Sequence, residues 1–430
     1  MILPANSIAV AHPGKQHSYQ VALAFQQAGL LRRFITGIYF KPEEFPYNMV
    51  RWLPRRFRER ALRELSKRRL AELDDRLITT IPFFEVASRT VGRAPLLMRL
   101  SGGQSSYLFA NWAGDWYVSQ WLRCCSPRPA ALYCFLGSAL RSFRQAKHLG
   151  VLTVLDVPIT LNAPSIIADE KRRLGMPGGS SGLATRLRAE VRTADYIIAP
   201  SQAVAESVIA QGVRSERVCI VPFGVDVERF HPASPRTLPG EKRFRVIFVG
   251  KMDLRKGMHH LLEAWRQLAL PRSELMMVGP PVDADFVGAM RTRYAGLFIE
   301  RGNVPHAELA SLFAGADVFA FPSLAEGSAL VTYEALASGL PCVVTHEAGS
   351  VVRDGIEGFV VPVGDVQALK DRLLCLYQNC ALRHQMAAAA RQRAEEFTWQ
   401  HYHARLVNAL DRMVASGPLA TEIALESPTR

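Results

Sequence analysis

The sequence lacks long apolar runs and has few cysteines. No stretch of about 18 uncharged apolar residues occurs, the length that a membrane-spanning helix needs. The first ten residues have neither the basic segment nor the apolar core of a secretory signal. The seven cysteines are scattered, form no CxxC pair and are odd in number, which indicates neither a zinc site nor a disulfide framework. We therefore expect a protein of the reducing cytoplasm.

Other signatures are missing too. Comparison of the sequence with itself at periods of about 20 to 50 residues gives no repeat, which argues against a solenoid. The absence of GxGxxG argues against a dinucleotide site. No aromatic and basic RNA-binding signature is present, so we expect no nucleic-acid partner.

Positive charge is what the chain has in excess. The net charge is +13, and residues 51–76 carry ten Lys or Arg against five acids. Apolar side chains, Trp52 and Phe57 among them, are interleaved near helical spacing, so we expect a basic amphipathic helical insertion here. Two interpretations remain open: contact with an anionic membrane surface, or a solvated helix face packed on its own domain.

The length of 430 residues predicts two domains. In the first, residues 1–235, short apolar runs alternate with amphipathic ones, which is typical of a parallel sheet covered on both faces. Strand-like runs occur at 7–11, 131–135, 151–155, 196–200 and 217–222, and helical ones near 17–28 and 138–149, with Ser201 placed to cap another helix.

A second series begins after the proline-rich segment 231–244, where we place the boundary. Strand-like runs occur at 244–250, 274–279, 296–300, 316–321 and 341–345, and helical ones near 257–269 and 328–338. We expect residues 244–396 to form a second doubly wound domain facing the first across a cleft, 397–414 a C-terminal helix, and 415–430 a flexible tail.

The densest group of candidate residues lies at 320–342. Glu326 and Glu334 are eight residues apart, in a loop and on the helix after it, so both carboxylates can face one ligand. We expect the N–H groups of Ser328, Ala329 and Leu330 to hold a phosphate at the helix N-terminus. The alternative is that Glu326 caps the helix and Glu334 is solvated.

Two further loops follow strands. In VGKMDLRKG, Lys251 and Lys256 can neutralise a diphosphate whose charge grows as a bond breaks. In AHPGKQHS, a glycine lets the backbone approach a ligand, while His12 and His17 either contact that ligand or are structural. The DxD pair Asp283 and Asp285 follows a turn, so we interpret it as a helix cap and not as a metal site.

These residues together resemble the GT4 family of retaining glycosyltransferases, which have the GT-B fold of two Rossmann-like α/β domains. EGSALVTYE matches the Glu-x7-Glu motif of that family and VGKMDLRKG its phosphate-binding loop. The passage AEVRTADYIIAPSQAVAESVIAQGV followed by IVPFGVDVERFHP is similar to its interdomain segment. The resemblance covers most of the chain.

The resemblance implies roles for single residues. Lys251, where relatives more often have arginine, and Lys256 would bind the diphosphate, Glu326 the donor sugar and Glu334 the ribose. Asp156 stands where many relatives have a histidine beside the reacting sugar, and we expect Glu326, Lys256 and Asp156 to be catalytic. The remaining donor residues would be Gly250, Gly279, Asn303, Val304, Pro305, Gly327, Ser328, Ala329 and Leu330, with Gly14, Lys15 and His17 on the acceptor side.

The resemblance also implies a reaction. A sugar would pass from a nucleotide-sugar, a UDP-sugar or GDP-mannose, to a hydroxyl of a lipid-linked or saccharide acceptor, with retention of configuration and with neither metal nor cofactor. We expect the protein to be cytoplasmic. Contact of residues 51–76 with the inner membrane surface is compatible with that location. Two alternatives stay open: a nucleotide-sugar epimerase of similar architecture, and a degenerate binding or scaffold protein.

Overall fold

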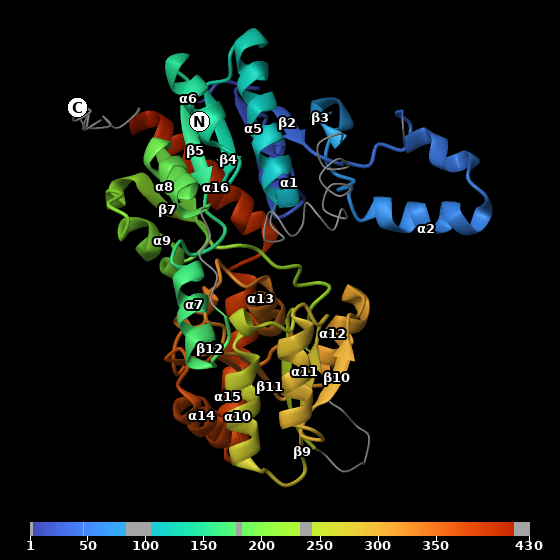
Figure 1. Cartoon of the computed structure of the whole chain (residues 1–430), viewed down its shortest axis with the longest axis vertical. Coiled ribbons are helices and arrows are strands. Elements are labelled where there is room, and N and C mark those ends of the chain that lie inside the picture. The colour runs from blue at the N-terminus through green and yellow to red at the C-terminus, as the bar shows by residue number, and fades with distance from the viewer. Residues whose placement is uncertain (1–2, 46, 83–104, 178–182, 233–242, 417–430) are drawn as a thin grey trace.

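The structure is a computed structural model that describes residues 3–45, 47–82, 105–177, 183–232 and 243–416. It consists of two α/β bodies stacked along the long axis of the molecule (Figure 1). Most of the expected boundary segment 231–244 and nearly all of the expected tail 415–430 lie outside the described residues.

The first body is built on a parallel sheet of seven strands in the order β3-β2-β1-β4-β5-β6-β7. Four of the expected strands lie within one residue of their expected bounds, and the expected 217–222 is shorter. The strands are β1 (Ile8–His12), β2 (Leu31–Thr36), β3 (Ile78–Thr80), β4 (Ala131–Phe135), β5 (Leu152–Asp156), β6 (Tyr196–Ala199) and β7 (Val218–Ile220).

Both faces of this sheet are buried. Along β4, Tyr133 and Phe135 point into one hydrophobic core and Leu132 and Cys134 into another, because successive side chains of a strand face opposite sides. All five residues of β4 are buried. A strand that is apolar without alternation is therefore the local sequence that a two-sided core requires.

Helices cover the two faces. The helix α1 (Ser18–Gln27) packs on one face, and α5 (Ser105–Cys124), α6 (Leu140–His148) and α8 (Leu183–Thr193) lie together on the other. Ser201 caps α9 (Gln202–Ile209), as expected, by accepting a hydrogen bond from the N–H of Val204. The helix α7 (Ala163–Arg173) follows β5 and reaches down beside the second body (Figure 1).

The second body contains a parallel sheet of six strands in the order β10-β9-β8-β11-β12-β13. Its strands are β8 (Phe244–Val249), β9 (Ser273–Val278), β10 (Ile299–Gly302), β11 (Val318–Phe321), β12 (Cys342–Thr345) and β13 (Gly358–Val361). The expected strand 296–300 was placed too early, because Gly296 has a positive φ of 77° and sits in a turn before β10.

Six α-helices belong to the described part of this second body. They are α10 (Met258–Leu268), α11 (Ala284–Arg293), α12 (His306–Ala314), α13 (Leu330–Ala337), α14 (Val366–Gln378) and α15 (Cys380–Glu395). The two doubly wound sheets confirm the expected fold class.

The chain returns to the first body through α16 (Trp399–Ser416), which packs against α1. His403 of α16 forms hydrogen bonds of 2.9 Å with both Gln20 and Gln27 of α1. The chain passes from the first body to the second near Val225 and returns near Phe397. The N–H of Val225 donates to the carbonyl of Phe397 at 2.9 Å, so these two connecting segments lie side by side.

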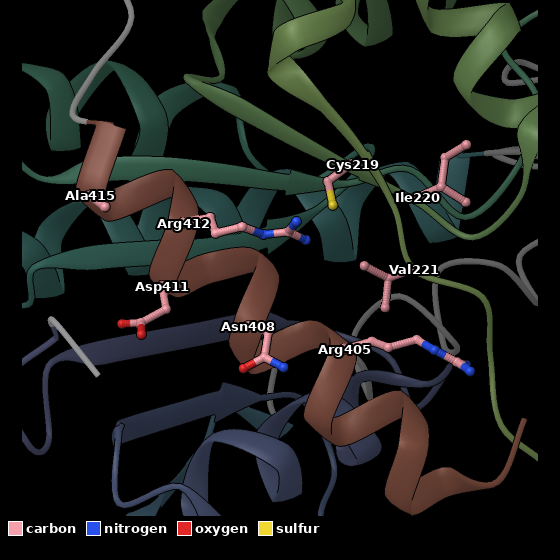
Figure 2. A pocket seen from close by; sticks show the side chains of 8 residues that line it. All are labelled: Cys219, Ile220, Val221, Arg405, Asn408, Asp411, Arg412 and Ala415. Atoms are coloured by element: carbon pink, nitrogen blue, oxygen red, sulfur yellow. The ribbon is translucent and has the colours of Figure 1, made fainter. Parts of the chain in front are cut away.

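A pocket of about 630 Å³ lies between α16 and the edge strand β7 (Figure 2). None of the residues expected to bind donor or acceptor lines it. Its lining residues are Cys219, Ile220, Val221, Arg405, Asn408, Asp411, Arg412 and Ala415.

The basic segment stands off the first body (Figure 1). It is not one helix over 51–76: a 3-10 helix (Tyr47–Trp52) is followed by α2 (Arg55–Ser66) and, later, a 3-10 turn (Asp75–Leu77). Pro54 separates the first 3-10 helix from α2, because proline has no N–H to continue a helix. No residue of α2 is fully buried, but Arg58, Ala61 and Leu65 are partly covered, so both interpretations of the segment stay open.

Candidate active site

The candidate residues gather where the second sheet changes direction. β8 and β11 are neighbours, yet the chain continues from β8 to one side of the sheet and from β11 to the other. Ligands of open parallel sheets bind outside the carboxyl ends of strands at such a switch point. The loop with Lys251 and Lys256 follows β8, and the loop with Glu326 follows β11.

The carboxylate of Glu326 lies against two cations. Its Oε1 accepts a hydrogen bond of 2.6 Å from Arg255 and a further one from Lys256. Glu326 is 9% exposed, and burial lowers the pKa of Lys256 although the Glu326 carboxylate opposes that shift. The two cations meet this carboxylate, and Lys256 also interacts more weakly with Asp253, in a largely buried place where a bound anion could take over part of these contacts.

The Glu326 loop also touches the first body. The N–H of Thr160 donates to the carbonyl of Glu326 at 3.3 Å, and the Ser201 hydroxyl donates to the carbonyl of Gly327. A Cβ at Gly327 would lie 1.7 Å from the carbonyl oxygen of Pro158, so only glycine allows this approach. The carboxyl ends of the two sheets therefore meet at Glu326 and Gly327.

One expected phosphate ligand is already engaged. α13 begins at Leu330, with Ala329 as its N-cap residue, and the N–H of Ala329 donates to the carbonyl of Ala348 at 3.0 Å. That amide is therefore not directed at a ligand, because the turn at 346–349 packs against the loop. Among the described residues the N–H groups of Ser328 and Leu330 have no partner, so two donors remain.

Glu334 is a partly buried residue of α13, with its side chain 14% exposed. Burial raises its pKa to about 8, while the nearby Arg229 lowers it. His306 is the ionisable group paired with it, at 3.9 Å from Nδ1 to Oε1. The alternative of a solvated Glu334 is wrong, and so is that of Glu326 as the helix cap. A strongly perturbed pKa of this kind is typical of functional sites.

The remaining donor residues border the same strand ends. Gly250 and Gly279 follow β8 and β9, and a Cβ at Gly279 would lie 1.9 Å from the carbonyl oxygen of Gly250. Asn303, Val304 and Pro305 connect β10 to α12, with Asn303 and Pro305 exposed. Lys251 is exposed and takes no part in the Glu326 cluster.

The N-terminal loop lies near this group. Lys15 is close enough to contribute to the lowered pKa of His306, and its Nζ donates to the carbonyl of Lys67 at 2.5 Å. A Cβ at Gly14 would lie 3.3 Å from His12, whose burial lowers its pKa to about 3. His12 is therefore neutral at physiological pH.

Asp156 ends β5 inside the first body. It is 1% exposed, and its Oδ2 accepts a hydrogen bond of 2.6 Å from the Tyr133 hydroxyl. The same oxygen is 2.9 Å from Nε2 of His17, which is also buried. Asp156 thus contacts His17 directly through Oδ2, while its Oδ1 is buried with no hydrogen-bond partner among the described residues.

One contact was missed by the sequence reasoning, and one interpretation is confirmed. Arg255, beside Lys256 in the same loop, was not among the expected residues although it contacts Glu326; its charge in VGKMDLRKG was the available signal. Asp283 caps α11 by accepting from the N–H of Phe286 at 3.1 Å, which confirms its interpretation as a cap.

Comparison with known proteins agrees with this geometry. A family model described as glycosyl transferases group 1 matches residues 243–379, and one described as glycosyltransferase family 4 matches residues 138–229. The chain is similar to a sulfoquinovosyl transferase of Arabidopsis thaliana, 27% identical over 59% of this chain and 51% of the relative. It is also similar to a phosphatidyl-myo-inositol mannosyltransferase of Mycobacterium tuberculosis, with 33% identity over 46% of this chain and 54% of the relative.

Among solved structures, the Anabaena protein HepE in complex with UDP and glucose has a TM-score of 0.59 at 17% identity, covering 94% of this chain and 99% of that one. This likeness shows the fold, GT-B. The chain spans about half the length of the curated relatives it matches. With both family models placed on the two halves of one GT-B fold, the chain belongs to the family 4 (GT4) glycosyltransferases.

Proposed function

We propose that the protein transfers a sugar from a nucleotide-sugar, a UDP-sugar or GDP-mannose, to a hydroxyl acceptor. The observation that carries the proposal is the Glu326 carboxylate held by Arg255 and Lys256 at the switch point between β8 and β11. A donor of this class needs cations for its diphosphate and carboxylates for its hydroxyls, and both lie here.

The residues divide the donor between them. Lys256 and Arg255 exchange part of their hydrogen bonding to Glu326 for contacts with the diphosphate. Lys251 and the N–H groups of Ser328 and Leu330 also bind the diphosphate. Glu326 then accepts hydrogen bonds from sugar hydroxyls, and Glu334 accepts from the ribose. Gly250, Gly279 and 303–305 border the base.

The proposed reaction retains the anomeric configuration. The bond from the anomeric carbon to the phosphate oxygen breaks, and the acceptor oxygen bonds to the same face of that carbon. The acceptor proton passes to the leaving phosphate, whose growing charge the cations stabilise more in the transition state than in the ground state. Asp156 acts as a positioning residue by holding His17.

Donor binding tests this proposal. Calorimetric titration with UDP-, GDP- and ADP-sugars in EDTA is expected to show one preferred donor, with affinity reduced at least about tenfold in Glu334→Ala and Glu326→Gln. EDTA is included because we propose that the donor site needs no metal. Glu308→Ala, which removes an exposed carboxylate of α12, is the matched control and should bind as wild type.

The outcomes separate the rival functions. No binding by folded wild-type protein would favour a binding or scaffold protein that has lost the site. Consumption of donor with no acceptor present and without hydrolysis would favour an epimerase.

We further propose an acceptor at a membrane, lipid-linked or a growing polysaccharide, at the cytoplasmic surface of the inner membrane. None of the described helices is both long and apolar enough to cross a bilayer. The region around α2 instead exposes large apolar side chains beside its arginines: Phe45 is 77% exposed, Trp52 75% and Phe57 52%. Exposed apolar and cationic groups on α2 and on the segment just before it suit an anionic lipid surface.

Vesicle binding tests the membrane proposal. Wild-type protein should sediment with vesicles containing anionic lipid and not with neutral ones. Reversing Arg55, Arg56 and Arg58 to Glu should abolish binding, whereas reversing the exposed Arg188, Arg192 and Arg301, an equal change in net charge, should not. Equal losses in both triple variants would show that only net charge matters and would contradict a role for α2.

A further inference from the structure

Three metal-ligating side chains meet where α7 of the first body lies beside α10 of the second. Glu170 comes from α7, and His259 and His260 come from the first turn of α10. The potential ligand atoms of the three lie within 4.8 Å of one another. Among the described residues, no other group of three or more His, Cys, Asp or Glu side chains has its potential ligand atoms this close together.

The two imidazoles converge on one oxygen. Nε2 of His259 is 2.9 Å and Nε2 of His260 is 3.1 Å from Oε1 of Glu170. Arg173 contacts the other oxygen, Oε2, at 3.4 Å, and its side chain is 74% exposed, so it does not occupy the point of convergence. Glu170 and His259 are buried, at 6% and 7% exposure.

The Nδ1 atom of each ring is buried and has no hydrogen-bond partner among the described residues, whereas each Nε2 atom faces Glu170. Among the described residues, the polar contacts of the two rings are therefore confined to the cluster itself.

We propose that Glu170, His259 and His260 bind a divalent transition-metal ion, Zn²⁺ by preference, that bridges the two domains. Two imidazole nitrogens and a carboxylate oxygen form the protein part of many zinc sites, with the fourth position open. At zinc–ligand distances of about 2.0 to 2.1 Å, tetrahedral ligands lie roughly 3.3 Å apart. The observed separations of 2.9 and 3.1 Å therefore need to widen by only a few tenths of an ångström.

The ion would stabilise the contact between the two bodies and would not contact the sugar. Its ligands include no residue of the Glu326 cluster, although α10 begins directly after the loop that carries Lys256. An ion that binds only the folded chain with its domains together stabilises that state. The donor titration in EDTA and the metal experiment below therefore succeed or fail separately.

Cobalt substitution tests the site in the full chain, prepared without a histidine tag and freed of metal with EDTA. Titration with Co²⁺ should give the visible absorption of tetrahedral cobalt, saturating at one ion per chain and lost on addition of Zn²⁺. Zinc should raise the melting temperature. His260→Ala and Glu170→Gln should each weaken binding at least about tenfold and remove the zinc-dependent increase.

His346→Ala is the matched control, since His346 forms an exposed pair with Glu206 at 3.2 Å and should not matter. Glu170→Gln keeps the side-chain shape, so it carries the test if His260→Ala does not fold. Absence of tetrahedral absorption in wild-type protein, or equal weakening in His346→Ala, would overturn the proposal.

Discussion

At the scale of single residues, the carboxyl group of Glu334 lowers the stability of the fold where the proposed ligand site needs it. Burial raises the pKa of its carboxyl group from 4.5 to about 8, so the folded protein keeps a proton that the unfolded chain loses. Between these values unfolding releases a proton, and the free energy of unfolding falls as pH rises, by up to about 1.4 kcal/mol per pH unit.

Glu334→Gln should remove this pH dependence. The stability advantage of the variant over wild type should be small near pH 5 and grow towards pH 8, while the variant binds donor more weakly. Urea unfolding of both proteins across this range measures the difference, in which the other titrating groups cancel. Parallel stability curves would show that Glu334 is solvated in solution.

Single residues were predictable where one residue type serves one chemistry. Glu326, Glu334 and Lys256 could be selected because a carboxylate pair and a loop cation suit a nucleotide-sugar. The hydrogen bond that engages the N–H of Ala329 could not be predicted, because its acceptor, the carbonyl of Ala348, is distant in sequence. Whether Asp156 faces a ligand or another side chain also depends on such distant neighbours as Tyr133.

At the scale of elements, α9 depends on Ser201 at its N-terminus. The Ser201 hydroxyl accepts from the N–H of Val204 at 3.4 Å and donates to the carbonyl of Gly327 in the other domain. Ser201→Ala should lower the free energy of unfolding by about 1 to 2 kcal/mol, because both bonds are lost.

Chemical unfolding of Ser201→Ala against Ser215→Ala checks this expectation. Ser215 is exposed and its hydroxyl donates only to the adjacent Glu216, so its replacement should change stability by less than about 0.5 kcal/mol. Equal effects of the two substitutions would mean that Ser201 contributes no more than an exposed serine.

Apolar character made several strands predictable, although the apolar β13 was not among the expected strands. β4 and β11 are continuous apolar runs and could be placed directly. β2 was missed because Arg32 and Arg33 interrupt its sequence, and β3 because three residues carry too little pattern. In both, pairing with neighbouring strands decides the conformation, and sequence periodicity does not report it.

At the scale of the whole molecule, Gly327 sets how closely the domains approach. A Cβ there would lie 1.7 Å from the carbonyl oxygen of Pro158, so Gly327→Ala must displace backbone, and we expect the two bodies to move apart. We expect a larger radius of gyration by small-angle X-ray scattering and donor affinity weaker by at least about tenfold, because the loop carries Glu326.

Gly288→Ala provides the comparison, since a Cβ at this position of α11 meets nothing within 4 Å. It should keep the wild-type radius and affinity. An unchanged radius in Gly327→Ala would mean that the loop yields locally and that the domains do not separate.

The return of the chain through α16 has a consequence for biosynthesis. The first body includes residues that follow the second body in the sequence, because α16 packs on α1 and fills part of its core through Tyr402 and Leu406. On the ribosome, residues 244–395 emerge in full before α16 does, so the second body can fold while the first still lacks a helix. The domain begun first is thus completed last, and until then it exposes the apolar face of α1 to chaperones.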